Sequence, residues 1–173
     1  PGLTGNWHAL VLAAGRGEND PMAKARNVSH KATLPVGGIA MLDRVLDTLR
    51  QSRSIGAVTI CIEDREIVRQ RLTDAGKPVR FCQSASSAPA SVLAAIRENP
   101  HYPLLVTTAD HPLLTPAMVD YFCTMAEANE ADLSVGLATA ETILQAYPQS
   151  LRTFFKLGRD RVSGCNLFAL TRE

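Results

Sequence analysis

Short apolar runs alternate with segments of helical periodicity along this chain, and this alternation constrains the fold more than any other feature. Runs of apolar and β-branched residues predict strands, whereas apolar residues repeated at helical spacing predict helices. The predicted strands are Ala9–Leu12, Ala57–Ile62, Val79–Cys82, Leu104–Thr108, Asp132–Ala138, Phe154–Leu157 and Asn166–Leu170. The predicted helices are Met41–Gln51, Asp64–Ala75, Ser91–Glu98, Pro116–Ala128 and Ala140–Tyr147. The pattern predicts βαβ units and therefore an α/β fold, with a mostly parallel sheet covered on both faces.

The size and charge of the chain fit a single domain with a small-molecule ligand. A chain of 173 residues predicts one domain that spans residues 1–173. The sequence leaves open whether a C-terminal segment completes this domain, and it leaves the oligomeric state open. A hydrophobic content of 46% is enough for a sizeable core. A net charge of +1 argues against nucleic acid as a partner.

The sequence gives no sign of membrane insertion or export. No apolar run reaches the roughly 18 residues that a membrane span needs, so we expect no membrane partner. The segment Pro1–Gly5 has neither the basic nor the apolar region of a signal peptide. The four cysteines form no C-x-x-C pair, so we expect them to be reduced and structural rather than zinc ligands. Together these features predict a cytoplasmic protein.

A small-residue loop with two glycines, Ala13–Gly17, follows the first predicted strand. Backbone N–H groups at the end of a buried strand can bind phosphate, so a nucleotide is the first ligand to consider. The loop is not a Walker loop, because the G-x-x-x-x-G-K-[ST] pattern is absent. It is a poor dinucleotide fingerprint, because Asp20 replaces the third glycine and no helical pattern follows in Glu18–His30. An NAD enzyme is therefore disfavoured, and an ordinary tight turn is the alternative to a phosphate loop.

A single carboxylate, Asp110, follows the buried strand Leu104–Thr108. At the carboxyl end of such a strand it faces the crevice where α/β proteins bind ligands, and it needs a cation or hydrogen bonds there. Magnesium is a suitable partner, because it prefers hard oxygen ligands and shares them with substrate phosphates. The alternative is an aspartate that caps the following turn. The neighbouring His111 has the same two interpretations, a metal ligand or a turn cap, and the second is favoured.

Three segments in order carry a family resemblance: Leu12–Gly17, then Lys31 with Leu34–Gly38, then Thr108–Pro116. Together they resemble the nucleotidyltransferases of the molybdenum-cofactor guanylyl/cytidylyltransferase and sugar-phosphate nucleotidyltransferase type. The resemblance implies a three-layer α/β/α, Rossmann-like fold of the glycosyltransferase-A type. It implies transfer of a nucleoside monophosphate from an NTP to a small phosphorylated acceptor, with Mg²⁺ as cofactor and pyrophosphate as the second product. A molybdopterin-type compound or a sugar phosphate is the implied acceptor.

The resemblance also implies roles for individual residues. The nucleotide would contact the loop and the strand ends, through Leu12, Ala13, Ala14, Gly15, Gly17, Lys31, Gln83 and Ser91. Lys31 would bind the phosphates, and Asp110 would bind magnesium. Asn166 resembles a late residue that assists metal or acceptor binding in some members. Arg16 is a further candidate for a catalytic cation.

One position departs from the family pattern. The family usually has an arginine two residues beyond the second glycine, and this chain has Asn19 there. Arg16, Lys24 or Arg26 could supply the missing cation, with a solvated loop as the alternative for Lys24 and Arg26. The other consequence is a nucleotide-binding or regulatory module of the same fold with weak or no turnover. The sequence does not identify the base or the acceptor.

Overall fold

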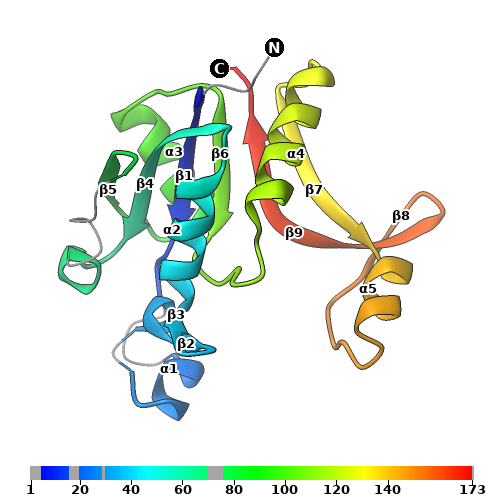
Figure 1. The fold of residues 1–173 in the computed structure, drawn as a ribbon, viewed down its shortest axis with the longest axis horizontal. Helices are drawn as coiled ribbons and strands as arrows, with labels where there is room; N and C mark the ends of the chain where they lie inside the picture. Colours follow the sequence, from blue (N-terminus) through cyan, green and yellow to red (C-terminus); the bar gives the residue numbers. More distant parts are fainter. Residues whose placement is uncertain (1–4, 16–19, 29, 70–75, 173) are drawn as a thin grey trace.

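The computed structural model describes residues 5–15, 20–28, 30–69 and 76–172. The chain folds around one large sheet, whose strands are β1 (Trp7–Leu12), β4 (Ile55–Ile62), β5 (Val79–Gln83), β6 (Leu104–Thr108), β7 (Leu133–Thr139), β8 (Phe155–Leu157) and β9 (Asp160–Leu170). The strand order is β5-β4-β1-β6-β9-β7, and β8 pairs with β9 (Figure 1). The strands β5, β4, β1 and β6 are parallel, whereas β9 runs antiparallel to β6, β7 and β8. The predicted α/β fold with a mostly parallel sheet is confirmed.

The helices are α1 (Pro21–Ala25), α2 (Met41–Gln51), α3 (Ala88–Glu98), α4 (Pro116–Ala128) and α5 (Ala140–Ala146). Short 3-10 turns occur at Lys31–Thr33 and Arg65–Ile67, and β2 (Pro35–Val36) with β3 (Ile39–Ala40) forms a small separate ribbon. The start of α4 follows from its sequence, because the Thr115 hydroxyl accepts a hydrogen bond from the Met118 N–H and Pro116 needs no backbone partner. Ser87 caps α3 in the same way through the Ala90 N–H.

Three predictions about secondary structure were wrong. The segment predicted as a helix from Asp64 has only a 3-10 turn within its described residues 64–69, because the Asp64 carboxylate accepts from the Glu66 N–H and closes a tight turn. The rest of that predicted helix lies outside the described residues. The region Glu18–His30, predicted without helix, contains the short helix α1. The last strand begins at Asp160 rather than Asn166, because pairing with β8 and β7 extends it through Asp160–Cys165, a segment of mixed polar and small residues with no continuous apolar run.

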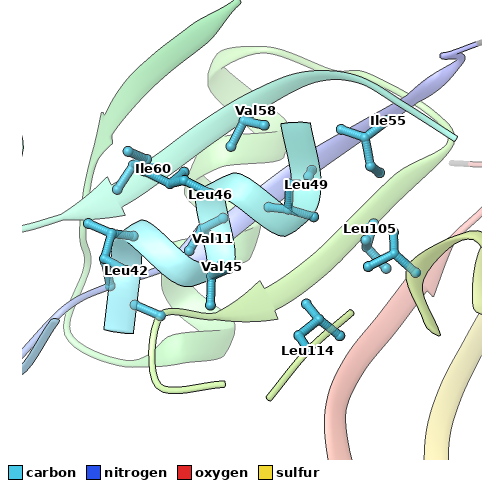
Figure 2. Packing of buried hydrophobic residues seen from close by; sticks show 14 of the residues in the cluster. Val11, Leu42, Val45, Leu46, Leu49, Ile55, Val58, Ile60, Leu105 and Leu114 are labelled. Carbon is cyan, nitrogen blue, oxygen red and sulfur yellow. The ribbon is translucent and has the colours of Figure 1, made fainter. Parts of the chain in front are cut away.

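Alternate residues of β1 supply the two faces of the sheet. Trp7, Ala9 and Val11 belong to the main core, which α2 and α4 cover, whereas Leu10 packs under α3. Figure 2 shows α2 with Leu42, Val45, Leu46 and Leu49 against the strands. Each fully buried leucine of this kind stabilises the fold by roughly 2 kcal/mol. Helices on both faces of the sheet give the three layers that the family resemblance implied.

Helix α3 covers only part of the sheet face that lies opposite α2 and α4. Under it lie Leu10, Cys61 and Leu104. The same face continues across β9 and β7, where Phe168 pairs with both Val106 and Val135. Phe168 and Val135 are exposed.

Parallel strands bring their carboxyl ends to the same edge of the sheet. The residues after β1, β4 and β6 are therefore neighbours, and the Ala109 N–H donates to the Leu12 carbonyl across that edge. No helix in the described part of the chain is long and apolar enough to cross a membrane.

Candidate functional site

A cavity of about 510 Å³ opens at the carboxyl edge of the sheet. Its walls come from the β1 and β6 ends, the 3-10 turn after His30 and the start of α3; the lining residues are Leu12, Ala13, Ala14, Gly15, Lys31, Ala32, Cys61, Ala85, Ser86, Ser87, Ala88, Ser91, Thr108, Ala109 and Asp110. The structure thus brings together seven of the residues predicted for the site, namely Leu12, Ala13, Ala14, Gly15, Lys31, Ser91 and Asp110.

An ion pair joins two of these residues. The Lys31 Nζ lies 2.5 Å from the Asp110 Oδ2, although the residues are 79 positions apart in the sequence. Both side chains remain about one third exposed, at 30% and 38%. Burial opposes ionisation of Asp110, but the hydrogen bond and the charge of Lys31 outweigh it and hold the pKa of Asp110 below its ordinary value. The cavity therefore has an ionised carboxylate and a cation in contact at its mouth.

A second network holds the glycine loop. The Gly15 N–H donates to both carboxylate oxygens of Glu63, at 3.2 Å each. The buried His30 accepts from the Ala32 N–H through Nδ1, so the proton of the neutral ring is on Nε2, which donates to Glu63 Oε1 at 3.0 Å. The amide of Gly15 is therefore already hydrogen-bonded in this structure and is not the bare donor expected for the loop.

This network also explains why position 15 is a glycine. A Cβ atom at Gly15 would lie 2.6 Å from His30 Nε2 and 3.2 Å from Glu63 Oε1. The imidazole is packed in the interior and cannot swing aside as an exposed side chain would. The glycine permits the close approach of the loop to the imidazole.

The first turn of α3 faces the same cavity. Ser86, Ser87 and Ala88 line it, and the buried Ser91 hydroxyl accepts from the Ala85 N–H at 2.9 Å. That bond fixes the segment before the helix against its first turn. Pro89 has no N–H and Ser87 accepts from the N–H groups of Ala90 and Ser91, so it is mainly the positive end of the helix dipole that favours an anion at this wall.

The other predicted site residues lie elsewhere. Gln83 is exposed and its Nε2 donates to the Glu63 carbonyl at 3.0 Å, and it is absent from the cavity wall. Asn166 is also absent from that wall, and its backbone has a φ of 52° at the point where the β7 and β9 register shifts. Lys24 and Arg26 are exposed and do not line the cavity. Arg16, Gly17 and Asn19 lie outside the described residues.

The residue after Asp110, His111, is influenced by a further cation, Arg152. His111 is half-buried, and its pKa is lowered from the ordinary value by burial and then by the charge of Arg152. Arg152 itself is exposed, and its Nη2 donates to the Gly164 carbonyl at 2.7 Å. This arginine therefore lies near the residue that follows Asp110.

The sequence reasoning missed Glu63 and the start of α3. Glu63 directly follows β4, and a polar residue at the carboxyl end of a parallel strand is a signal that could have identified it. The pairing of Glu63 with His30 depends on tertiary contacts and leaves no trace in local sequence.

Comparison with known proteins gives one family match. Residues 9–153 match the family model of the MobA-like NTP transferase domain. The chain is 25% identical over 158 residues to the bifunctional protein GlmU of Enterococcus faecalis, which covers 91% of this chain and 32% of that protein. The chain therefore spans about a third of the length of this curated relative.

Two solved structures share the fold. A hypothetical transferase from Thermus thermophilus has a TM-score of 0.73 and 24% identity, covering 95% of this chain and 64% of its own. A CMP:2-keto-3-deoxy-manno-octonic acid synthetase, solved with CTP, has a TM-score of 0.68 and 12% identity, covering 96% of this chain and 74% of its own. At these identities the structural likeness shows the fold alone.

Proposed function

This chain belongs to the MobA-like NTP transferase domain family, and on that premise we propose that it transfers a nucleoside monophosphate from an NTP to a small phosphorylated acceptor. The observation that carries the proposal is the cavity in which the loop after β1, the start of α3, Lys31 and Asp110 converge. The matched relative and the CTP-bound neighbour support the same class of chemistry. We expect the protein to act in the cytoplasm.

The reaction needs no covalent intermediate on the protein. A phosphate oxygen of the acceptor attacks the α-phosphorus of the NTP, and the bond from that phosphorus to the bridging oxygen of the β-phosphate breaks. The electron pair leaves with pyrophosphate, and the new phosphoanhydride joins the nucleoside monophosphate to the acceptor. Because the attacking phosphate is already anionic, the chain has to supply positioning and charge neutralisation rather than a base.

The described residues fit these needs. The positive end of the α3 dipole favours the phosphates, and Lys31 offers a point charge on a flexible stem. Leu12–Gly15 form the wall against which the nucleoside would pack. Ser91 fixes the segment beside that wall, whereas the predicted roles of Gln83, Arg16, Gly17 and Asn166 stay predictions.

Asp110 fits a magnesium ion that is shared with the substrate. Its carboxylate is ionised and exposed at the cavity mouth, and oxygen ligands of this kind suit Mg²⁺. The described residues contain no group of three or more His, Cys, Asp or Glu side chains that could hold a metal by themselves. Phosphates and water would therefore complete the coordination, as is usual for Mg²⁺. When bound, the ion would neutralise charge on the phosphates and on the leaving pyrophosphate.

The test is pyrophosphate release from each of the four NTPs with Mg²⁺ and a panel of sugar 1-phosphates and molybdopterin-type acceptors. We expect Asp110→Asn to lower the rate by about a hundredfold or more, because loss of a charge-stabilising group costs several kcal/mol. Asp47→Asn is the matched control, because Asp47 is exposed on α2 and its ion pair among the described residues is the local one with Arg50. Wild-type rates in Asp110→Asn would refute the metal role.

A second candidate is a nucleotide-binding module without turnover. The observation that favours it is the Glu63 carboxylate on the Gly15 N–H, where a phosphate would otherwise accept. Calorimetric binding of an NTP with no pyrophosphate from any acceptor in the panel would support this candidate. Release of pyrophosphate that requires an acceptor would exclude it.

A further inference from the structure

We propose that Arg152 binds the phosphate group of the acceptor, on the side of Asp110 that faces away from the nucleotide cavity. This inference rests on the proposed function and adds to it a residue that decides which acceptors are bound. Neither the family resemblance nor the spacing of motifs singled out this arginine. It lies between α5 and β8, outside the three motif segments.

The sheet topology places Arg152 on the β9 side of the edge where Asp110 lies. Strand β9 pairs antiparallel with β6 at Leu105–Ala169 and Val106–Phe168. Residues that precede Phe168 in β9 therefore extend toward the carboxyl end of β6, where Asp110 follows. Gly164 is one of these residues, and its carbonyl holds the Arg152 guanidinium at 2.7 Å.

The guanidinium retains donors for a ligand. The hydrogen bond to the Gly164 carbonyl uses one of the five N–H groups of the side chain. Within the described part of the chain, no carboxylate lies at ion-pair distance from Arg152. The Arg152 side chain is also exposed, so solvent reaches it. The Arg152 guanidinium is held by one hydrogen bond and forms no ion pair with a described carboxylate. A planar cation with free N–H donors of this kind suits a phosphate monoester.

The position assigns this cation to the acceptor rather than to the NTP. The nucleotide cavity is lined from β1, β4, β6 and α3, and Arg152 is not among its lining residues. Strand β9 lies on the other side of β6 in the sheet. In-line displacement requires the attacking oxygen to approach the α-phosphorus opposite the leaving pyrophosphate. A phosphate on Arg152 would approach from the β9 side of Asp110, which separates it from the wall that receives the NTP.

The test uses phenyl phosphate as a monoester probe, with calorimetry for affinity and backbone amide shifts for location. We expect Arg152→Gln to bind phenyl phosphate about tenfold or more weakly than wild type, as loss of a charge-assisted hydrogen bond implies. Arg152→Lys keeps the positive charge but lacks the planar guanidinium, so its affinity for phenyl phosphate should lie between those of wild type and Arg152→Gln. Arg159→Gln is the matched control, because Arg159 is exposed in the turn of the same β8–β9 hairpin.

The outcomes separate this inference from the proposed function. Amide shifts should concentrate at His111, Arg152 and Gly164, and the affinity of Arg152→Gln for each NTP should equal that of wild type. Equal phenyl phosphate affinity in wild type and Arg152→Gln, or shifts confined to the NTP cavity, would overturn the role of Arg152. Absence of NTP binding and of pyrophosphate release would instead overturn the proposed function, whatever the phenyl phosphate result.

Discussion

His8 gives the most quantitative prediction from this structure, a loss of stability in mild acid. The residue lies on β1, where its Nε2 is 2.7 Å from the Thr59 Oγ1 and its ring stacks on His101 at 5.0 Å between centroids. Burial, followed by the charges of His101 and Arg80, lowers the pKa of His8 from 6.5 to about 4. The folded protein therefore disfavours the protonated ring.

The sign and size of the effect follow from this pKa. The unfolded chain binds the proton more readily, so the contribution is complete above pH 6.5 and is lost as the pH falls toward 4. The full difference corresponds to about 3.4 kcal/mol. Solvent reaches a large part of the half-buried ring, and screening reduces this value. We expect His8 to account for about 1–2 kcal/mol of the lost free energy of unfolding.

The assay compares urea unfolding of wild type and His8→Gln at about pH 7.5 and about pH 4.5, because glutamine does not titrate between them. Other groups titrate equally in both proteins, so the difference between the two losses isolates His8. The loss on acidification should be about 1–2 kcal/mol smaller in the variant. Equal losses in the two proteins, or an NMR titration of the His8 ring near pH 6.5, would refute the reasoning.

Three further substitutions test individual contacts. Gly15→Ala should lower the free energy of unfolding by about 1–3 kcal/mol and weaken NTP binding, because the new Cβ collides with His30; unchanged urea unfolding and thermal shifts with NTP would contradict this. Ser87→Ala removes the cap of α3 and should cost about 1 kcal/mol in urea unfolding, whereas a loss below the error of the measurement would show that the cap does not contribute. Asp120→Ala leaves the donors of residues 52–54 without their acceptor and should cost about 1–3 kcal/mol by the same measurement, with an unchanged midpoint as the contrary result.

The helices and strands that form the layers were predictable, because burial of one helix side or of a whole strand leaves a regular pattern of apolar residues in the sequence. Helix α2 has apolar residues on one side only, and β4 is an almost continuous apolar run, so both could be recognised in isolation. The Thr115–Pro116 pair even identified the first residue of α4. The turn at Arg65–Ile67 was mistaken for a helix, because its polar and apolar residues satisfy helical spacing while the Asp64 side chain closes a shorter turn.

The site was only partly predictable, since its contacts join distant strand ends. Lys31 and Asp110 could each be selected as a charged residue beside a motif, but their direct pairing depends on the order of strands in the sheet. Glu63 belongs to no motif and becomes significant only when β1 and β4 lie side by side. Arg152 is still further from the motifs, and its position depends on its hydrogen bond to the Gly164 carbonyl of β9.

The contact between Lys31 and Asp110 has a consequence for the order of binding under the proposed function. Each charge neutralises the other, so a metal ion that binds Asp110 alone displaces the lysine and leaves its charge without a partner. A nucleotide that attracts Lys31 alone leaves the carboxylate beside the triphosphate, where the two repel. When the metal ion and the nucleotide bind together, the Lys31–Asp110 ion pair is replaced by two, one between Asp110 and the metal ion and one between Lys31 and the triphosphate. Metal and nucleotide should therefore strengthen each other's affinity by the same factor, as linkage requires, and the empty site should discriminate against either one alone.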